Sequence, residues 1–112
     1  MAGWFELAKA GNGQFKFVLK AGNGEVILTS ELYTNQAGAS NGIASVQKNA
    51  ADPVRYEAKL ASNGKHHFNL KAANHQVIGS SQLYASEAAC RNGMASVQST
   101  GSTAVIKDLT RA

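Results

Sequence analysis

The three histidines and the single cysteine have the chemically most versatile side chains in this chain. His66 and His67 are adjacent in a predicted strand, so their side chains point to opposite faces and cannot readily bind one metal ion. Glu57 could complete a site with His67, but an exposed polar position is the simpler interpretation. Cys90 has no evident base beside it, and one cysteine excludes an internal disulfide and argues against a thiolate zinc site. We therefore predict neither a metal site nor a cofactor.

Serines and glycine-rich turns give no stronger sign of catalysis. Ser45 and Ser96 lie outside any Gly-x-Ser-x-Gly motif, and nothing pairs them with His and Asp. The Gly-Asn-Gly turns at 11–13 and 22–24 connect strand to strand, whereas a phosphate loop leads from a strand into the N-terminus of a helix. No acid, base and nucleophile converge, so we predict no catalytic residue.

The more informative polar residues alternate with apolar ones along the predicted strands, which assigns them to the open face of a one-sided sheet. A tryptophan amid Lys, Arg and Asn can stack a nucleic-acid base and hold a phosphate. The simpler interpretation is an ordinary solvated face with the tryptophan as a terminal anchor. The candidate binding surface comprises Trp4, Lys16, Lys20, Arg55, Lys59, His67, Asn69 and Lys71.

Composition limits the class of protein. Apolar residues make up 44% of the chain and charged residues 16%, which is typical of a globular protein. The net charge of +4 permits weak attraction to nucleic acid, but basic residues are scattered among acidic ones and form no cluster. No apolar run approaches the ~18 to 20 residues that cross a bilayer, and the N-terminus lacks the pattern of a signal peptide. We expect a cytoplasmic protein without a membrane partner.

The chain is organised around a motif that it uses twice, Asn-Gly-Ile/Met-Ala-Ser-Val-Gln. Asn41 and Gly42 begin the first copy, Asn92 and Gly93 the second, and the offset is 92 − 41 = 51 residues. This offset carries most of the first half onto the second without a gap. Each glycine lies within a predicted helix, where it costs about 1 kcal/mol relative to alanine. Its recurrence indicates a close approach of the helix to the sheet or to the other helix.

Each half is predicted to form three strands, a helix and a closing strand. Apolar residues recur at helical spacing up to about Lys48, and Thr34 is the predicted N-cap of this first helix. Ser86 is the predicted N-cap in the second half. The predicted strands lie at 5–10, 15–20 and 25–29 in the first half and at 65–72, 76–80 and 103–109 in the second, with the second helix at 86–98.

The segment from Val54 to Leu60 has two predicted roles. By the same offset Val54 matches Val105 of the closing strand, whereas Tyr56 matches Phe5 of the opening strand. One continuous strand can therefore end the first unit and begin the second.

These motifs together resemble the YegP-like family of small uncharacterised bacterial proteins. The resemblance covers essentially the whole chain, twice, and it implies no activity. It implies an α+β fold in which two tandem β-β-β-α-β repeats form one mainly antiparallel sheet, with both helices on one face and C-terminal strands exchanged between repeats. We expect residues 1–112 to form a single domain of two pseudo-symmetric repeats, approximately 4–54 and 55–109, and the protein to be a monomer.

Function is therefore a choice between classes. The first hypothesis is a non-catalytic binding module that uses the open sheet face for a protein partner. One alternative is a weak binder of single-stranded nucleic acid. The other is a small enzyme with a site at the cleft between the repeats, where pseudosymmetry could bring together Asn41 and Asn92, or Tyr33 and Tyr84.

Overall fold

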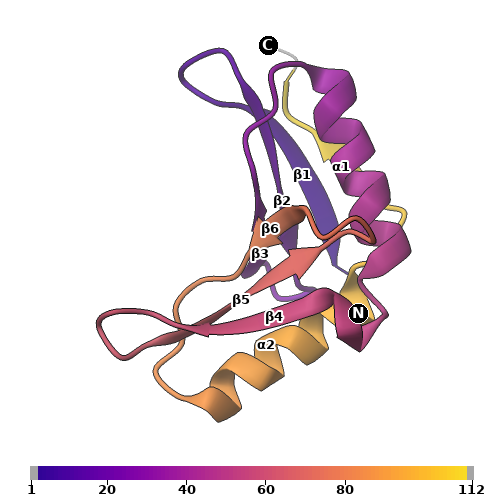
Figure 1. The fold of residues 1–112 in the computed structure, drawn as a ribbon. Coiled ribbons are helices and arrows are strands. Elements are labelled where there is room, and N and C mark those ends of the chain that lie inside the picture. The colour runs from indigo at the N-terminus through magenta and orange to yellow at the C-terminus, as the bar shows by residue number, and fades with distance from the viewer. Residues whose placement is uncertain (1–2, 111–112) are drawn as a thin grey trace.

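The computed structural model describes residues 3–110, in which one seven-stranded sheet and two α-helices form an α+β fold (Figure 1). The order of strands is β4-β5-β6-β3-β2-β1-β7, and every neighbouring pair is antiparallel except β1 with β7. The α+β fold predicted from the sequence is confirmed. The strands are β1 (Trp4–Lys9), β2 (Phe15–Lys20), β3 (Val26–Ser30), β4 (Tyr56–Leu60), β5 (His66–Lys71), β6 (Val77–Ser80) and β7 (Ile106–Asp108), and the helices are α1 (Gln36–Asn49) and α2 (Glu87–Thr100).

The first β-hairpin of each repeat turns on the Asn-Gly pairs that the sequence analysis identified. Gly13 and Gly64 adopt φ angles of 85° and 82°, a region that costs glycine little and other residues more. The second turn of the first repeat uses Gly24 in the same way, with φ of 86°. In the second repeat His75 takes this place with φ of 70°, so a histidine adopts a glycine conformation there.

Both helices begin with a side chain that accepts a backbone hydrogen bond. The N-cap of α1 is Asn35, whose Oδ1 accepts from the amide of Gly38 at 2.7 Å. The N-cap of α2 is Ser86, as predicted, and its Oγ accepts from the amide of Ala89 at 3.1 Å. The predicted cap Thr34 is therefore wrong by one residue. Asn35 and Ser86 occupy the same repeat position, since 35 + 51 = 86.

The connection between the repeats differs from the predicted continuous strand over 54–60. Pro53–Arg55 forms a 3₁₀ turn, η1, and β4 begins only at Tyr56. The carboxylate of Asp52 accepts from the amide of Val54 at 3.1 Å, and proline favours the first position of a helical turn. Val54 therefore lies outside the sheet, and β4 is the opening strand of the second repeat.

The closing strand β7 belongs to the second repeat but pairs in parallel with β1 of the first. The amide of Phe5 donates to Val105 O at 2.9 Å, and the amide of Leu109 donates to Leu7 O at 2.7 Å. No reciprocal strand of the first repeat extends the opposite edge of the described sheet, where β4 is terminal. Within residues 3–110, strand exchange therefore runs in one direction.

One hydrophobic core lies between the sheet and the helices and draws on both repeats. Helix α1 packs on β1 and β2 and reaches β6, whereas α2 packs on β5 and reaches β3. The register aligns Phe5, Leu19 and Leu28 across three strands, so their side chains share the helix-covered face. The largest fully buried side chains come from both halves: Phe5, Phe17, Phe68, Leu19, Leu28, Ile43, Leu70, Val46 and Val97.

The repeated glycines of the helices lie under tyrosine rings. A Cβ atom added at Gly42 would lie 2.8 Å from Cζ of Tyr33, and one at Gly93 would lie 2.6 Å from Cζ of Tyr84. Each tyrosine stacks on a buried phenylalanine of the sheet. The close approach that requires glycine is therefore made by a tyrosine ring that packs between the helix and the sheet. In the described part of the chain, no helix is long and apolar enough to cross a membrane.

Candidate binding surface

The open face of the sheet carries the predicted surface residues in two separate groups. Trp4, Lys16 and Lys20 lie on β1 and β2, whereas Lys59, His67, Asn69 and Lys71 lie on β4 and β5. Strands β6 and β3 separate the two groups in the sheet order. The predicted residues therefore do not form one continuous basic patch.

Glu6 is the centre of the group on β1 and β2. Its Oε2 accepts a hydrogen bond from Nε1 of Trp4 at 2.8 Å and lies 3.1 Å from Nζ of Lys20. The hydrogen bond from Trp4, followed by the hydrogen bond and charge of Lys20, lowers the pKa of the Glu6 carboxyl despite its partial desolvation. Lys107 of β7 places its Nζ 4.2 Å from the centroid of the Trp4 ring. The indole is thus held by its neighbours, and one of its faces is covered by a cation.

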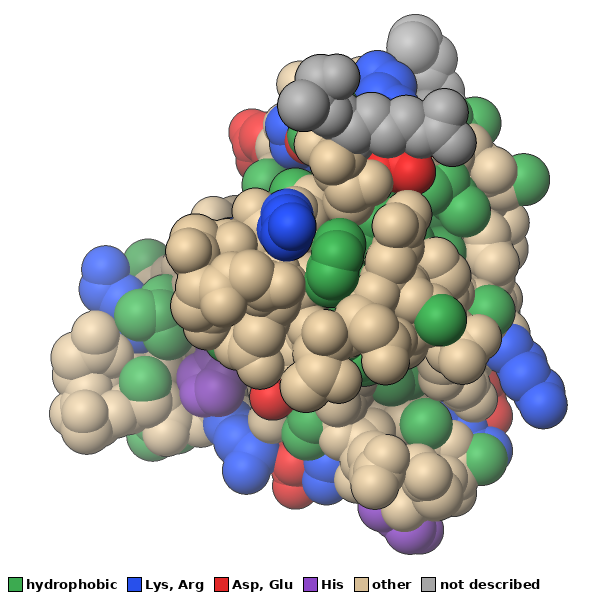
Figure 2. Space-filling view, turned by 90° about the horizontal axis from the view of Figure 1, so that it is seen from above, with side chains coloured by type: hydrophobic (Ala, Val, Ile, Leu, Met, Phe, Trp, Pro, Cys, Tyr) green, Lys and Arg blue, Asp and Glu red, His purple; other side chains and the backbone are tan. Residues whose placement is uncertain are grey.

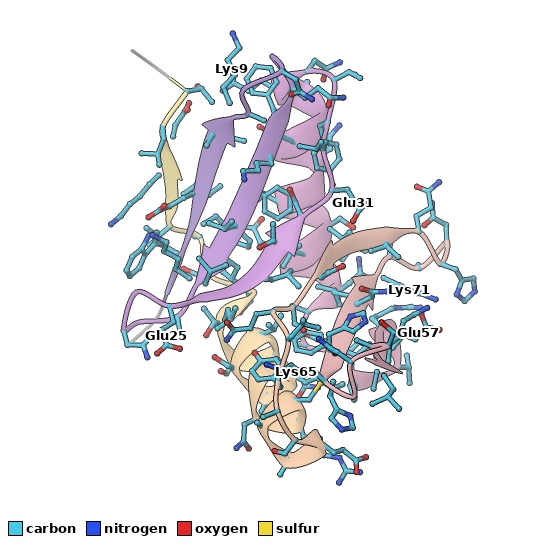
Figure 3. The ribbon with its side chains drawn as sticks, turned by 90° about the vertical axis from the view of Figure 1, so that its left-hand side faces the viewer. Lys9, Glu25, Glu31, Glu57, Lys65 and Lys71 are labelled. Atoms are coloured by element: carbon cyan, nitrogen blue, oxygen red, sulfur yellow. The ribbon has the colours of Figure 1, made fainter. Side chains whose placement is uncertain are left out.

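The group on β4 and β5 repeats this arrangement around Glu57, since 6 + 51 = 57 and 20 + 51 = 71. Nζ of Lys71 lies 2.9 Å from Oε1 of Glu57, and both side chains are labelled in Figure 3. Nζ of Lys59 lies 3.6 Å from the same oxygen atom. The hydrogen bond from Lys71 is the largest cause that lowers the pKa of Glu57. Because both side chains are partly exposed to solvent, the pair adds little stability, but Glu57 neutralises one of the two lysine charges beside it.

Of the remaining predicted residues, Asn69 and Arg55 interact with neighbouring side chains. Asn69 accepts a hydrogen bond from Oγ of Ser80 at 2.7 Å. Arg55 was predicted to lie on a strand, but it ends η1, and its Nε lies 3.6 Å from Oδ2 of Asp52 without a hydrogen bond. His67 lies opposite Lys59 in the register of β4 with β5.

A shallow hollow of about 260 Å³ opens on the β1–β2 part of this face. Its apolar lining comes from Ala8, Val18, Val26 and Leu109, and its polar rim from Glu6, Lys16 and Lys20; Phe17 also contributes. We call this feature the β1–β2 hollow. Leu109 is 56% exposed and Val26 36% exposed. The alternation of Val18 with Lys16 and Lys20 indicated part of this surface, but Leu109 reaches it only because β7 crosses to β1.

Two observations concern metal binding and thiol chemistry in the described residues. Residues 3–110 contain no group of three or more His, Cys, Asp or Glu side chains that could hold a metal ion. Burial and the nearby charge of Glu87 raise the pKa of the Cys90 thiol, so this buried cysteine is protonated at neutral pH. It packs as a small apolar side chain.

The cleft between the repeats has a volume of about 420 Å³ and is lined by residues from both. Tyr33 and Asn41 contribute from the first repeat, and the segment around Asn74 contributes from the second, but neither Tyr84 nor Asn92 lines this cleft. Burial, with a contribution from Glu31, raises the pKa of Tyr33, so its hydroxyl is a poor base at neutral pH. The symmetric pairs considered from the sequence therefore do not meet there.

Comparison with known proteins agrees with this repeat structure. The family model described as a domain of unknown function, DUF1508, matches residues 10–57 and again residues 61–108. The chain belongs to the DUF1508 family. The two matches start 61 − 10 = 51 residues apart, which is the offset found in the sequence. The resemblance to the YegP-like family is thereby confirmed.

Bacterial relatives match along the whole chain. The UPF0339 protein of Shewanella oneidensis is 64% identical over 110 residues, which cover 98% of this chain and 100% of that protein. The UPF0339 protein YegP of Escherichia coli K12 is 61% identical over the same share of each chain. A solution NMR structure of YegP from E. coli, a protein of unknown function, superposes with a TM-score of 0.94 at 60% identity and covers 100% of this chain and 97% of that one. These comparisons establish the family and fold and assign no activity.

Proposed function

We propose that this protein is a non-catalytic binding module that holds a protein partner against the β1–β2 hollow of its open sheet face. The observation that carries the proposal is the composition of the hollow, in which an apolar lining lies beside the Glu6–Lys20 ion pair and Lys16. Protein interfaces share this arrangement of an apolar centre and a polar rim. Exposed Leu109 and Val26 supply apolar area that a partner would remove from water.

The charge arrangement favours a protein partner over single-stranded nucleic acid. Lys20 and Lys71 each form an ion pair with a glutamate, so they have less positive charge to offer a phosphate. Trp4 has Lys107 against one face, which leaves less of the ring for stacking of a base. Seen from above in Figure 2, Lys and Arg side chains are dispersed and acidic side chains lie among them.

A photocrosslinking experiment tests the proposal. A photoreactive residue at position 109 of the full chain, expressed in cells of the source bacterium, should trap a discrete protein, and Lys16→Glu at the rim should reduce its yield. The matched control places the photoreactive residue at exposed Val54, which is 77% exposed and lies in η1. The same crosslinks from both positions, or none from position 109, would refute the proposal.

Titration of a fluorescent single-stranded oligonucleotide at low salt tests the alternative. A salt-sensitive interaction that Lys20→Glu with Lys71→Glu weakens would support nucleic-acid binding, and a flat titration would exclude it.

We further propose that the protein is a monomer, because its core is shared within one chain. We also propose that it is cytoplasmic. Light scattering after gel filtration tests the monomer, and cell fractionation tests the location.

A further inference from the structure

The two ends of the sheet are equivalent in sequence but not in structure. Strand β1 is covered by β7, whereas its counterpart β4 forms the terminal strand of the described sheet. By the repeat offset, Phe5 and Leu7, whose backbone groups bond to the β7 segment, correspond to Tyr56 and Ala58. Strand β4 of the second repeat therefore corresponds to a strand that pairs with β7, but no strand of the described residues pairs with its outer edge.

The backbone of β4 offers hydrogen-bonding groups at this edge. The amide of Ala61 donates to Lys65 O at 2.7 Å. In an antiparallel pair every second residue of a strand forms its backbone hydrogen bonds with the same neighbouring strand. The backbone groups of Lys59 and Glu57 therefore face β5. The amide and carbonyl of Ala58 consequently point away from β5, toward the outside of the sheet. The amide of Tyr56 already donates to Pro53 O, which limits the open edge to its C-terminal part.

An apolar groove of about 330 Å³ lies between this edge and α2. Ala58, Leu60, Cys90 and Met94 form its apolar lining, with Glu87 and Arg91 from the first turns of α2. In the first repeat Leu7 stands where Ala58 stands here, and it is 3% exposed, whereas Ala58 is exposed. The smaller alanine and the missing strand together leave room for an incoming side chain.

We propose that the groove between β4 and α2 (the β4–α2 groove) binds an extended segment of a partner protein, which adds to the sheet as a strand parallel to β4. The occupied counterpart indicates the segment's chemistry. Beside β1, Ile106 lies next to Phe5, and Asp108 lies next to Leu7 and accepts from Nε2 of Gln36 at 3.2 Å. This segment has an apolar residue followed two residues later by an acidic one.

The β4–α2 groove favours the apolar part of this pattern, whereas its charges differ from those beside β1. Lys59, Arg91 and Glu87 line it, but Lys59 already pairs with Glu57 at 3.6 Å and Arg91 lies 3.1 Å from Glu87. By the repeat offset Glu87 stands where Gln36 donates to Asp108, so an acidic residue is not favoured beside Ala58, and the apolar residue at the place of Ile106 carries the recognition. A second copy of this chain is a poorer source of the segment, because its own β7 is already bonded to its β1.

NMR titration of the full-length protein tests this inference with a synthetic peptide of the sequence of residues 103–110. Saturable shifts should appear at Ala58, Leu60 and Met94 and stay absent at Phe5 and Trp4. Ala58→Pro removes the outward amide but none of the hydrogen bonds to β5, and it should weaken binding at least about tenfold. Leu60→Glu places a charge in the apolar lining without a change in the backbone hydrogen bonds, and it should also weaken binding.

A control peptide in which aspartate replaces the residue of Ile106 should bind less tightly, because its carboxylate would enter the apolar groove. Shifts at β1 would mean that the peptide displaces β7, and absence of shifts at millimolar peptide would mean that the edge is closed; either result overturns the inference. Concentration-dependent dimerisation that protects the Ala58 amide would identify a second copy as the occupant and would also overturn it. The crosslinking test of the β1–β2 hollow concerns another surface, so the two proposals can fail separately.

Discussion

Replacement of Gly93 by alanine tests the packing that the repeated motif encodes. An added Cβ would lie 2.6 Å from Cζ and 3.1 Å from Cε2 of Tyr84, whereas carbon atoms pack best at about 3.5 to 4.0 Å. The ring cannot simply retreat toward the sheet, because it stacks on fully buried Phe68 at a centroid distance of 6.5 Å and an interplanar angle of 8°. The substitution must therefore displace the ring, α2 or both.

The magnitude follows from two opposing effects. Overpacking in a filled core costs about 1 to 3 kcal/mol, whereas alanine gains about 1 kcal/mol over glycine within a helix. We expect Gly93→Ala to reduce the free energy of unfolding by up to about 2 kcal/mol. In a Tyr84→Ala background the clash is absent, so the same substitution should stabilise the protein by about 1 kcal/mol.

Urea unfolding followed by circular dichroism measures all four variants of this double-mutant cycle. The coupling free energy between positions 84 and 93 should be about 1 to 3 kcal/mol. Ala95→Gly at an exposed position of α2 is the matched control, and it should lose the same free energy in both backgrounds. If Gly93→Ala has the same sign with and without the tyrosine ring, the packing explanation of the repeated glycine is wrong.

The other predictions concern a turn, a cap, a carboxylate and the shared core. His75→Gly should stabilise the protein by up to about 1 kcal/mol in thermal or urea unfolding, because its φ of 70° disfavours side chains with a Cβ. Asn35→Ala should cost about 1 kcal/mol in urea unfolding, whereas Thr34→Ala should change stability by less than about 0.5 kcal/mol; equal losses would mean that the cap is assigned wrongly. Because the folded state lowers the pKa of Glu6, this carboxylate stabilises the protein above its unfolded pKa, and that stability is lost as pH falls through the lower folded pKa. Glu6→Gln should flatten this part of an acid unfolding profile, and an unchanged profile would contradict the role of Glu6. A shortened chain that ends near Asn49 should be unfolded or dimeric in gel filtration, and a stable folded monomer would count against a core shared by the repeats.

Much of the fold could be predicted from the sequence because it rests on local chemistry. The Asn-Gly turns set the hairpins, since only residues that tolerate positive φ permit them, and the apolar periods of 2 and 3.6 set the strands and helices. Because the chain repeats itself, each element could be predicted from two stretches of sequence. Ser86 is correctly predicted as a cap because Ala85, at the place of Thr34, has no side chain that could cap. Its counterpart Asn35 was missed in favour of neighbouring Thr34.

The candidate sites depended on contacts that local patterns do not encode. The sequence placed Lys20 and Lys71 on the open face, but it did not reveal that Glu6 and Glu57 would neutralise them across neighbouring strands. Such pairs depend on strand register, which couples residues distant in the chain.

By itself the sequence determined the family, the repeat length and the order of elements, because these follow from short-range spacing and from a duplicated motif. Only the tertiary structure decided where the last strand goes. With β7 paired to β1, Leu109 joins the β1–β2 hollow and the edge of β4 stays open, although β1 and β4 have equivalent sequence positions. The physical reason is connectivity. The residues that would form the closing strand of the first repeat overlap with β4, and one segment cannot occupy two places in the sheet.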